Sequence, residues 1–290
     1  MKITFLGTSS CESVPGIFCN CDFCTELRKR LALGEENALK TARTRTQTLI
    51  DDKILVDIGP DTYHNALENG LNLSSLTHVL QTHSHEDHFI PQELYLRREP
   101  YAYGLAKEDL ALVGSTRIGE MFQFFATLFG ESTSGVSFQL AKPLTPVKMG
   151  EYTVTALPSL HMATEDTFVY LIEKGKASHL VCNDTGILPE ETFHYLVNWA
   201  KTGKTLSSVA LECPIGESSF QYKWHLNFSQ VVEMVRRFKE TGIASDQTLC
   251  YVNHISQEYE DKYYQEYCAF AKDYGILVPY DGLSIELKEG

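Results

Sequence analysis

The stretch His83-Ser84-His85-Glu86-Asp87-His88 places three of the ten histidines and two acids within six residues. Imidazole nitrogens and carboxylate oxygens are the protein ligands of Zn²⁺, Mn²⁺ and Fe²⁺. On an extended segment, His83 and His85 point to the same side of the chain. A turn after them would send Asp87 and His88 in another direction. The stretch therefore predicts ligands for two adjacent metal ions, and a solvated polar turn is the alternative.

The flanking residues place this cluster between two regular elements. Residues 76–82 are apolar between polar ends, which predicts a strand, so the histidines would emerge where that strand ends. Residues 89–98 predict a helix, because Pro91 is tolerated in a first helical turn.

Composition excludes some classes of protein. The chain has 290 residues, 43% of them hydrophobic, and a formal net charge of −13. Its longest basic run is Arg97-Arg98, so we expect neither an extended nucleic-acid surface nor a membrane surface as partner. No segment is long and apolar enough to cross a bilayer. The negative net charge does not exclude an anionic small molecule as substrate, because two bound dications would make the local electrostatic potential positive.

The start of the chain and its eight cysteines indicate in which cellular compartment we expect the protein. Residues 1–7 hold one cation and a short apolar run, which predicts a first strand rather than a signal peptide. Three cysteines crowd at positions 19, 21 and 24, and the others are scattered. We therefore expect a reduced, cytoplasmic protein.

Short apolar runs with helical stretches between them predict an α/β protein with two sheets and helices outside. No linker, low-complexity segment or repeat interrupts the chain, so we expect one domain over residues 1–290. Residues 189–201 and 227–240 predict helices, the second opening with Asn227 and Gln230 at capping-box spacing. The expected strands are 2–6, 48–56, 78–82, 111–114, 152–157, 167–173, 179–183, 208–211, 249–252 and 283–287.

Four further strand ends carry a candidate side chain: Asp57, His161, Asp184 and His254. Each has an ordinary alternative when taken alone. Asp184 before Thr-Gly could cap a turn, and the histidines could be hydrogen-bonded structural residues. For Asp57 we favour holding the 83–88 loop by hydrogen bonds over touching a metal.

Taken together, these residues resemble the metallo-β-lactamase superfamily with its His-x-His-x-Asp-His signature. The resemblance implies a four-layer αβ/βα sandwich, the metallo-β-lactamase fold, with two divalent metals (zinc, manganese or iron) at one edge of the sheets. By position, it implies that one metal is held by His83, His85 and His161, and the other by Asp87, His88 and His254, with Asp184 bridging. It also implies a hydroxide between the metals as nucleophile and Asp87 as a catalytic residue that orients it.

The cysteine-rich loop at residues 11–24 narrows the resemblance. Cys19, Cys21 and Cys24 have the spacing of a structural zinc half-site, and three free thiols are the alternative. With the preceding Gly-Thr-Ser and Val-Pro segments, the loop is similar to that of the cyclic-phosphate phosphodiesterases of the carbon–phosphorus lyase pathway. Those enzymes complete the zinc site with a histidine three residues after the last catalytic histidine. Here that residue is Gln257, so the fourth ligand stays open.

A remaining histidine, His225, precedes the helix expected at 227–240. Similar His-x-Asn segments occur in phosphodiesterase branches of the superfamily. By that resemblance His225 is catalytic: it would hydrogen-bond a phosphoryl oxygen or protonate the leaving group. A surface histidine near the helix start is the alternative.

The resemblance implies hydrolysis of a small phosphodiester, either cyclic or linear. The alternatives are an accessory protein of pyrroloquinoline quinone biosynthesis, which opens with a similar cysteine loop, a thioester or lactone hydrolase, and a non-catalytic metal-binding module. We expect residues 101–137 to shape the pocket. Their aromatic side chains, together with Phe138, could form a substrate wall, a homodimer contact or ordinary core, and core is the safer interpretation.

Overall fold

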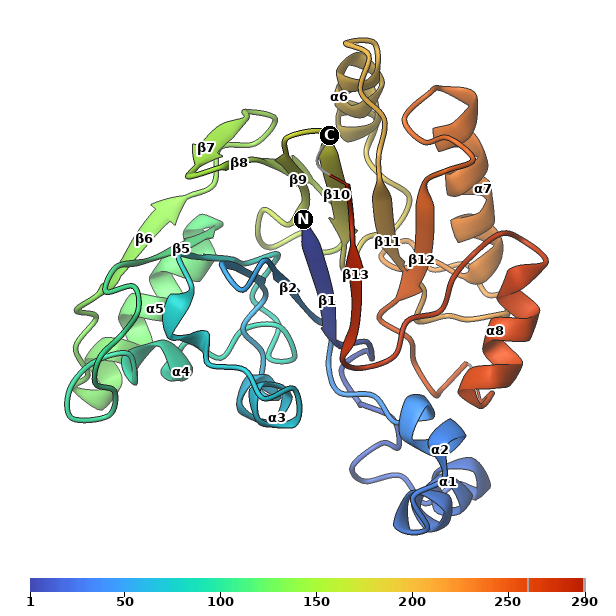
Figure 1. Ribbon diagram of the computed structural model, residues 1–290, viewed down its shortest axis with the longest axis horizontal. Coiled ribbons are helices and arrows are strands. Elements are labelled where there is room, and N and C mark those ends of the chain that lie inside the picture. Colours follow the sequence, from blue (N-terminus) through green and yellow to red (C-terminus); the bar gives the residue numbers. More distant parts are fainter. Residues whose placement is uncertain (260, 289–290) are drawn as a thin grey trace.

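The computed structural model describes residues 1–259 and 261–288, and it contains two β-sheets that pack against each other with helices outside (Figure 1). The first sheet has seven strands in the order β13-β1-β2-β3-β4-β5-β6, and the second has six in the order β12-β11-β10-β9-β8-β7. The strands are β1 Lys2–Gly7, β2 Gln47–Ile50, β3 Ile54–Val56, β4 His78–Leu80, β5 Leu110–Gly114, β6 Val136–Leu140, β7 Val147–Met149, β8 Tyr152–Pro158, β9 Phe168–Lys174, β10 Ala177–Cys182, β11 Ser208–Glu212, β12 Leu249–Asn253 and β13 Leu283–Glu286.

The helices cover the two outer faces of the sheets and extend one end of the molecule (Figure 1). They are α1 Asp22–Ala32, α2 Glu36–Thr41, α3 Thr62–Glu68, the short 3₁₀ helix η1 Leu73–Ser75, α4 Gln92–Tyr95, α5 Thr116–Phe129, α6 Glu190–Ala200, α7 Phe228–Glu240 and α8 Tyr264–Lys272. None of the helices in the described part of the chain combines the length and hydropathy of a transmembrane span.

Three apolar clusters fill the space between the layers of sheets and helices. One lies between the sheets and joins residues such as Phe5 and Val56 to Tyr170 and Val181. A second packs α6, α7 and α8 on the outer face of the six-stranded sheet, and a third packs α4 and α5 on the outer face of the seven-stranded sheet. The resulting order of layers confirms the expected αβ/βα sandwich.

The direction of the strands places their carboxyl ends at one shared edge of the two sheets. In the first sheet β3, β4, β5 and β6 are parallel, and in the second β10, β11 and β12 are parallel. Strand β8 runs the same way as β10, because each pairs antiparallel with β9. The carboxyl ends of these strands therefore open onto a common edge, the usual position of ligand sites in such sheets.

Two of the expected elements were wrong in extent. The strand expected at 48–56 is a hairpin of β2 and β3, which turns at Asp51 and Asp52 with φ of 49° and 55°. The helix expected at 89–98 is only the short α4, because Phe89 pairs with Ile58 as an isolated bridge before the chain can coil. Helices α6 and α7 match their predicted bounds closely, and Asn227 and Gln230 form the capping box.

Candidate metal centre and active site

Every side chain predicted to hold or support the two active-site metals lies at the common edge of the two sheets. In the first sheet, Asp57 follows β3 and the 83–88 loop follows β4. In the second sheet, His161 follows β8, Asp184 follows β10 and His254 follows β12. The edge thus gathers side chains that are up to 197 residues apart, the separation of Asp57 and His254.

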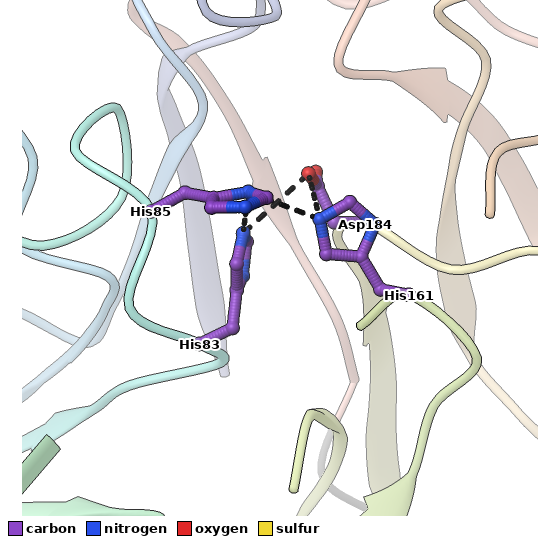
Figure 2. Close-up of side chains that lie close together, drawn as sticks. All are labelled: His83, His85, His161 and Asp184. Carbon is purple, nitrogen blue, oxygen red and sulfur yellow. Dashed lines mark hydrogen bonds and ion pairs between the residues drawn. The ribbon is translucent and has the colours of Figure 1, made fainter. Parts of the chain in front are cut away.

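One group of four side chains consists of His83, His85, His161 and Asp184, whose ligand atoms lie within 4.8 Å of one another. His85 Nδ1 is 3.0 Å from His83 Nε2 and 3.1 Å from His161 Nε2. Figure 2 shows the two histidines of the 83–85 segment facing His161 and the carboxylate of Asp184 across a small gap. Three imidazole nitrogens and a carboxylate converging in this way suit a single cation.

The second group contains Asp87, His88 and His254. His88 Nε2 is 3.1 Å from Asp87 Oδ2, and His254 Nε2 is 3.0 Å from Asp184 Oδ1. Asp184 faces both groups: its Oδ1 is also 3.3 Å from His88, while its Oδ2 is 3.3 Å from His161. One carboxylate oxygen therefore points to each group, which is the geometry that a bridging ligand needs.

Outer partners fix the orientation of the imidazoles. His88 Nδ1 lies 2.8 Å from Asp57 Oδ2, and His83 Nδ1 lies 3.0 Å from Thr82 Oγ1. Thr46 Oγ1 lies 3.1 Å from His254 Nδ1. With Nδ1 engaged, Nε2 of each ring is left to face the cluster. Asp57 is fully buried and stands behind His88, in the supporting position that we favour for it.

The residues fit divalent metals on two grounds. Asp184 Oδ1 and His88 Nε2 are buried, and neither makes a hydrogen bond of good geometry with a described residue. An unsatisfied buried polar atom is costly unless another partner binds it. In addition, Asp57, Asp87 and Asp184 surround a single imidazole, so the second group carries an excess of buried negative charge.

The electrostatics of two imidazoles, those of His83 and His161, agree with this arrangement. Burial lowers the pKa of His83 well below its ordinary value and that of His161 to about 4. Both rings are therefore neutral, the form that binds metals. Burial opposes the charge on His88 too, but the carboxylates of Asp87 and Asp184 raise its pKa well above the ordinary value.

His225 lies beside the metal ligands without belonging to either group. Its ring is 4.8 Å from that of His161, and its Nδ1 is 2.7 Å from Glu212 Oε2. Glu212 is fully buried at the end of β11 and also accepts a hydrogen bond of 2.9 Å from the Leu226 amide. Burial opposes protonation of His225, but the Glu212 carboxylate raises its pKa to about 9. The pair thus holds an oriented imidazole next to the cluster.

Sequence reasoning missed two supporting acids, Glu212 and Glu165. The ligand atoms of Glu212, Asp184 and His254 lie within 4.8 Å of one another. Glu165 accepts hydrogen bonds from the amide and hydroxyl of Ser84, which ties the loop after β8 to the 83–88 loop. The position of Glu212 at a strand end, like Asp184, was the one signal that could have found it.

The cysteine-rich loop forms a separate cluster. The sulfurs of Cys19, Cys21 and Cys24 lie within 4.8 Å of one another, and all are free thiols. Gln257 faces them, since its Oε1 is 2.7 Å from Cys24 Sγ and 2.9 Å from the Gly16 amide. The structure therefore brings the expected fourth position to the thiols and places an amide oxygen there.

The cavity beside the metal ligands has a volume of about 470 Å³, a size typical of small-molecule sites. Its walls come from the loops after β1, β11 and β12. The expectation that residues 101–137 shape it was wrong: none of the described residues in that range lines the cavity. The range includes β5, α5 and the start of β6 with the loops around them; in α5, Phe122 is buried core, whereas Phe124 and Phe129 are exposed.

Comparison with known proteins identifies the family. A family model described as the beta-lactamase superfamily domain matches residues 52–243. A diphosphatase of the PhnP family has a similar structure, with a TM-score of 0.70 and 20% identity over 98% of this chain and 96% of that one. Zn²⁺-bound PqqB from Methylobacterium extorquens gives a TM-score of 0.69 and 16% identity over 99% and 100% of the two chains.

The short form of human tRNase Z gives a TM-score of 0.66 and 13% identity over 99% of this chain and all of that one. Such low identities establish a shared fold only, and no curated protein sequence matches the chain significantly. The family model, the sandwich and the ordered ligand positions lead to one conclusion: the chain belongs to the β-lactamase superfamily and has the metallo-β-lactamase fold.

Proposed function

We propose that the protein is a metal-dependent hydrolase that cleaves a small phosphodiester. The observation that carries the proposal is the Glu212–His225 pair, whose imidazole lines the same cavity as Asp87, Asp184 and His254. A thioester or lactone hydrolase also needs the metal ligands, but it has less need of an additional imidazole that binds no metal and is held in place by Glu212. Cleavage of a phosphodiester needs such a group at the departing oxygen.

The cofactors in this proposal are two divalent ions of zinc, manganese or iron. His83, His85 and His161 would hold one, Asp87, His88 and His254 the other, and Asp184 would bridge them. When bound, the two ions supply polarisation of the phosphoryl oxygens and a reactive water at neutral pH. A third ion, a structural zinc, would bind Cys19, Cys21 and Cys24.

The residues of the chain then have distinct tasks. Glu212 accepts a hydrogen bond from Nδ1–H of His225 and so directs Nε2 toward the cavity. His225 Nε2 would donate its proton to the oxygen of the departing group. Asp87 is buried beside His88 and would orient the attacking water through its carboxylate. The substrate is a small molecule in a cavity of about 470 Å³, and the free thiols favour a cytoplasmic setting.

A second candidate is a role like that of PqqB, an accessory protein of pyrroloquinoline quinone biosynthesis. It is favoured by a TM-score of 0.69, nearly that of the diphosphatase. In that case the metals and the cysteine loop would be present, but phosphodiesters would not be turned over.

Elemental analysis together with three assays tests the proposal. The purified protein should contain two or three metal ions per chain and hydrolyse bis(p-nitrophenyl) phosphate or a 2′,3′-cyclic nucleotide in preference to a thioester. The His194→Ala variant is the matched control for His225→Ala, because His194 lies on the exposed face of α6. Two bound metals without turnover of either phosphodiester would favour the second candidate.

A further inference from the structure

A row of aromatic rings leads from the surface of the cavity to the metal ligands. Tyr259 and Phe220 have ring centroids 6.5 Å apart and planes 8° from parallel, and Phe220 and Tyr222 are 6.1 Å apart at 19°. The row continues from Tyr222 to His225 at 5.8 Å and 23°, and from His225 to His254 at 6.3 Å and 11°. Successive rings are thus roughly parallel.

The outer rings of this row are exposed to solvent. Phe220 is 51% exposed, Tyr222 45% and Tyr259 38%, although all three line the cavity. Exposed rings gathered at the mouth of a cavity indicate a binding surface rather than a folding core. A flat ring of a ligand could stack on them, as nucleic-acid bases stack on aromatic side chains.

The charge of the cavity restricts what else such a ligand carries. Among the described residues that line it, none is lysine or arginine, whereas Glu12 and Glu258 are acidic. The nearby Arg45 lines a neighbouring cavity, and its guanidinium is 3.1 Å from Asp61. The described part of the wall thus offers no lysine or arginine to bind a second phosphate group. The anionic part of a ligand would therefore bind where the two metal ions of the proposed function bind.

From these observations we infer that the substrate is a phosphodiester with a flat aromatic substituent, such as a nucleobase, and no further phosphate. The aromatic group stacks on Phe220 and Tyr222, next to His225, while the phosphodiester reaches the metal ligands. This inference rests on the proposed function for the position of the phosphate. It adds the class of substituent and excludes bisphosphorylated substrates.

Direct binding measured by calorimetry on the Mn²⁺-loaded protein tests this inference. AMP and phenyl phosphate both carry a ring on a phosphate, ribose 5-phosphate lacks the ring, and adenosine 3′,5′-bisphosphate adds a phosphate. We expect AMP to bind at least about 10-fold more tightly than ribose 5-phosphate, and the bisphosphate to bind more weakly than AMP. Comparison of AMP with phenyl phosphate separates a nucleobase from any aryl group.

Two variants test whether the preference for AMP over ribose 5-phosphate comes from the exposed rings of the cavity. Phe220→Leu should reduce the ratio of the two affinities towards one, because it keeps the apolar volume and removes the ring. Phe129→Leu is the matched control, since Phe129 is another exposed, stacked ring that does not line the cavity. Its ratio should equal that of the parent.

The outcomes that count against the inference differ from those that count against the hydrolase. Equal affinities for AMP and ribose 5-phosphate, no measurable binding of AMP, or tighter binding of the bisphosphate would overturn the inference. The inference would also be overturned if Phe220→Leu kept the parent's ratio of affinities for AMP and ribose 5-phosphate. If phosphodiesters are hydrolysed in any of these cases, the proposed function still stands. If AMP is preferred but no phosphodiester is hydrolysed, the aromatic subsite stands and the hydrolase fails.

Discussion

The His/Asp cluster and the cysteine-rich loop are both candidate metal sites, yet they are built very differently. In the His/Asp cluster, His83, His88 and His254 are buried and each has its second nitrogen engaged. In the cysteine loop, only Cys24 is buried, and Gln257 takes the remaining position. The contrast teaches that the His/Asp cluster is held in place by buried outer partners, whereas the cysteine loop is more exposed and relies on one side chain, Gln257, for its outer contact.

Removing the shared ligand should have the largest effect. Asp184 faces both groups of ligands, so Asp184→Asn should lower the metal content of the His/Asp cluster from two ions to one or none. Turnover should fall by more than the roughly 100-fold that the loss of an outer partner costs. Elemental analysis and a phosphodiester assay measure both effects. Asp246→Ala, at a side chain that is 95% exposed, is the control; a variant of Asp184 that retains two ions would contradict the bridge.

The Glu212–His225 pair should affect rate without affecting metal content. His225→Ala should lower turnover by about 10²–10⁴-fold, the range for general acid–base help, and keep the metals. Glu212→Gln should have a smaller effect in the same direction, because an amide can still accept the hydrogen bond from His225. Steady-state kinetics and elemental analysis check this. If His225→Ala hydrolysed a phosphodiester as fast as the parent, the assignment of His225 would be wrong.

Changes in the cysteine loop should leave catalysis largely intact. Cys24→Ser should release any third zinc ion and lower the free energy of unfolding by about 1–3 kcal/mol, since Cys24 is buried. The two other ions should stay bound. Thermal unfolding with zinc analysis measures these effects, and Cys268→Ser, on α8, is the control for loss of a thiol. Loss of the two ions of the His/Asp cluster in Cys24→Ser would show that the sites are not independent.

Restoring a nitrogen ligand should have the smallest effect. Gln257→His would place an imidazole where the amide oxygen now faces the thiols, and imidazole is a better zinc ligand. We expect zinc to bind the loop about 10-fold more tightly, equal to about 1.4 kcal/mol. Competition with a chromogenic chelator measures the change, and Gln247→His in an exposed turn is the control. An unchanged affinity would mean that the loop does not use this position for zinc.

Local patterns predicted much of the fold and of the site. The 83–88 stretch predicts metal binding by itself, because its candidate ligands are neighbours in sequence. The capping box of α7 could be predicted for the same reason, since Asn227 and Gln230 are only three residues apart. Isolated residues were harder to interpret. His161, Asp184 and His254 became candidates only through their positions at strand ends, and Glu212 was overlooked although it occupies the same kind of position. The short hydrogen bond that reveals it spans 13 residues and depends on the loop before α7 folding back.

The expected pocket wall was wrong for a similar physical reason. Aromatic content alone pointed to residues 101–137, but α5 packs on the outer face of the seven-stranded sheet, away from the edge where the strands end. The rings that do line the cavity, such as Phe220 and Tyr222, lie in a loop without a recognisable local pattern.

The sequence by itself determined which types of candidate ligand the chain offers, their order along the chain and the strand ends that carry them, because these depend on neighbouring residues. Only the tertiary structure decided that Asp184 turns one oxygen to each ligand group, that Gln257 faces the three thiols, and that Glu212 orients His225. The reason is that strand direction and sheet packing set the distance between residues far apart in the chain. No local pattern contains that distance.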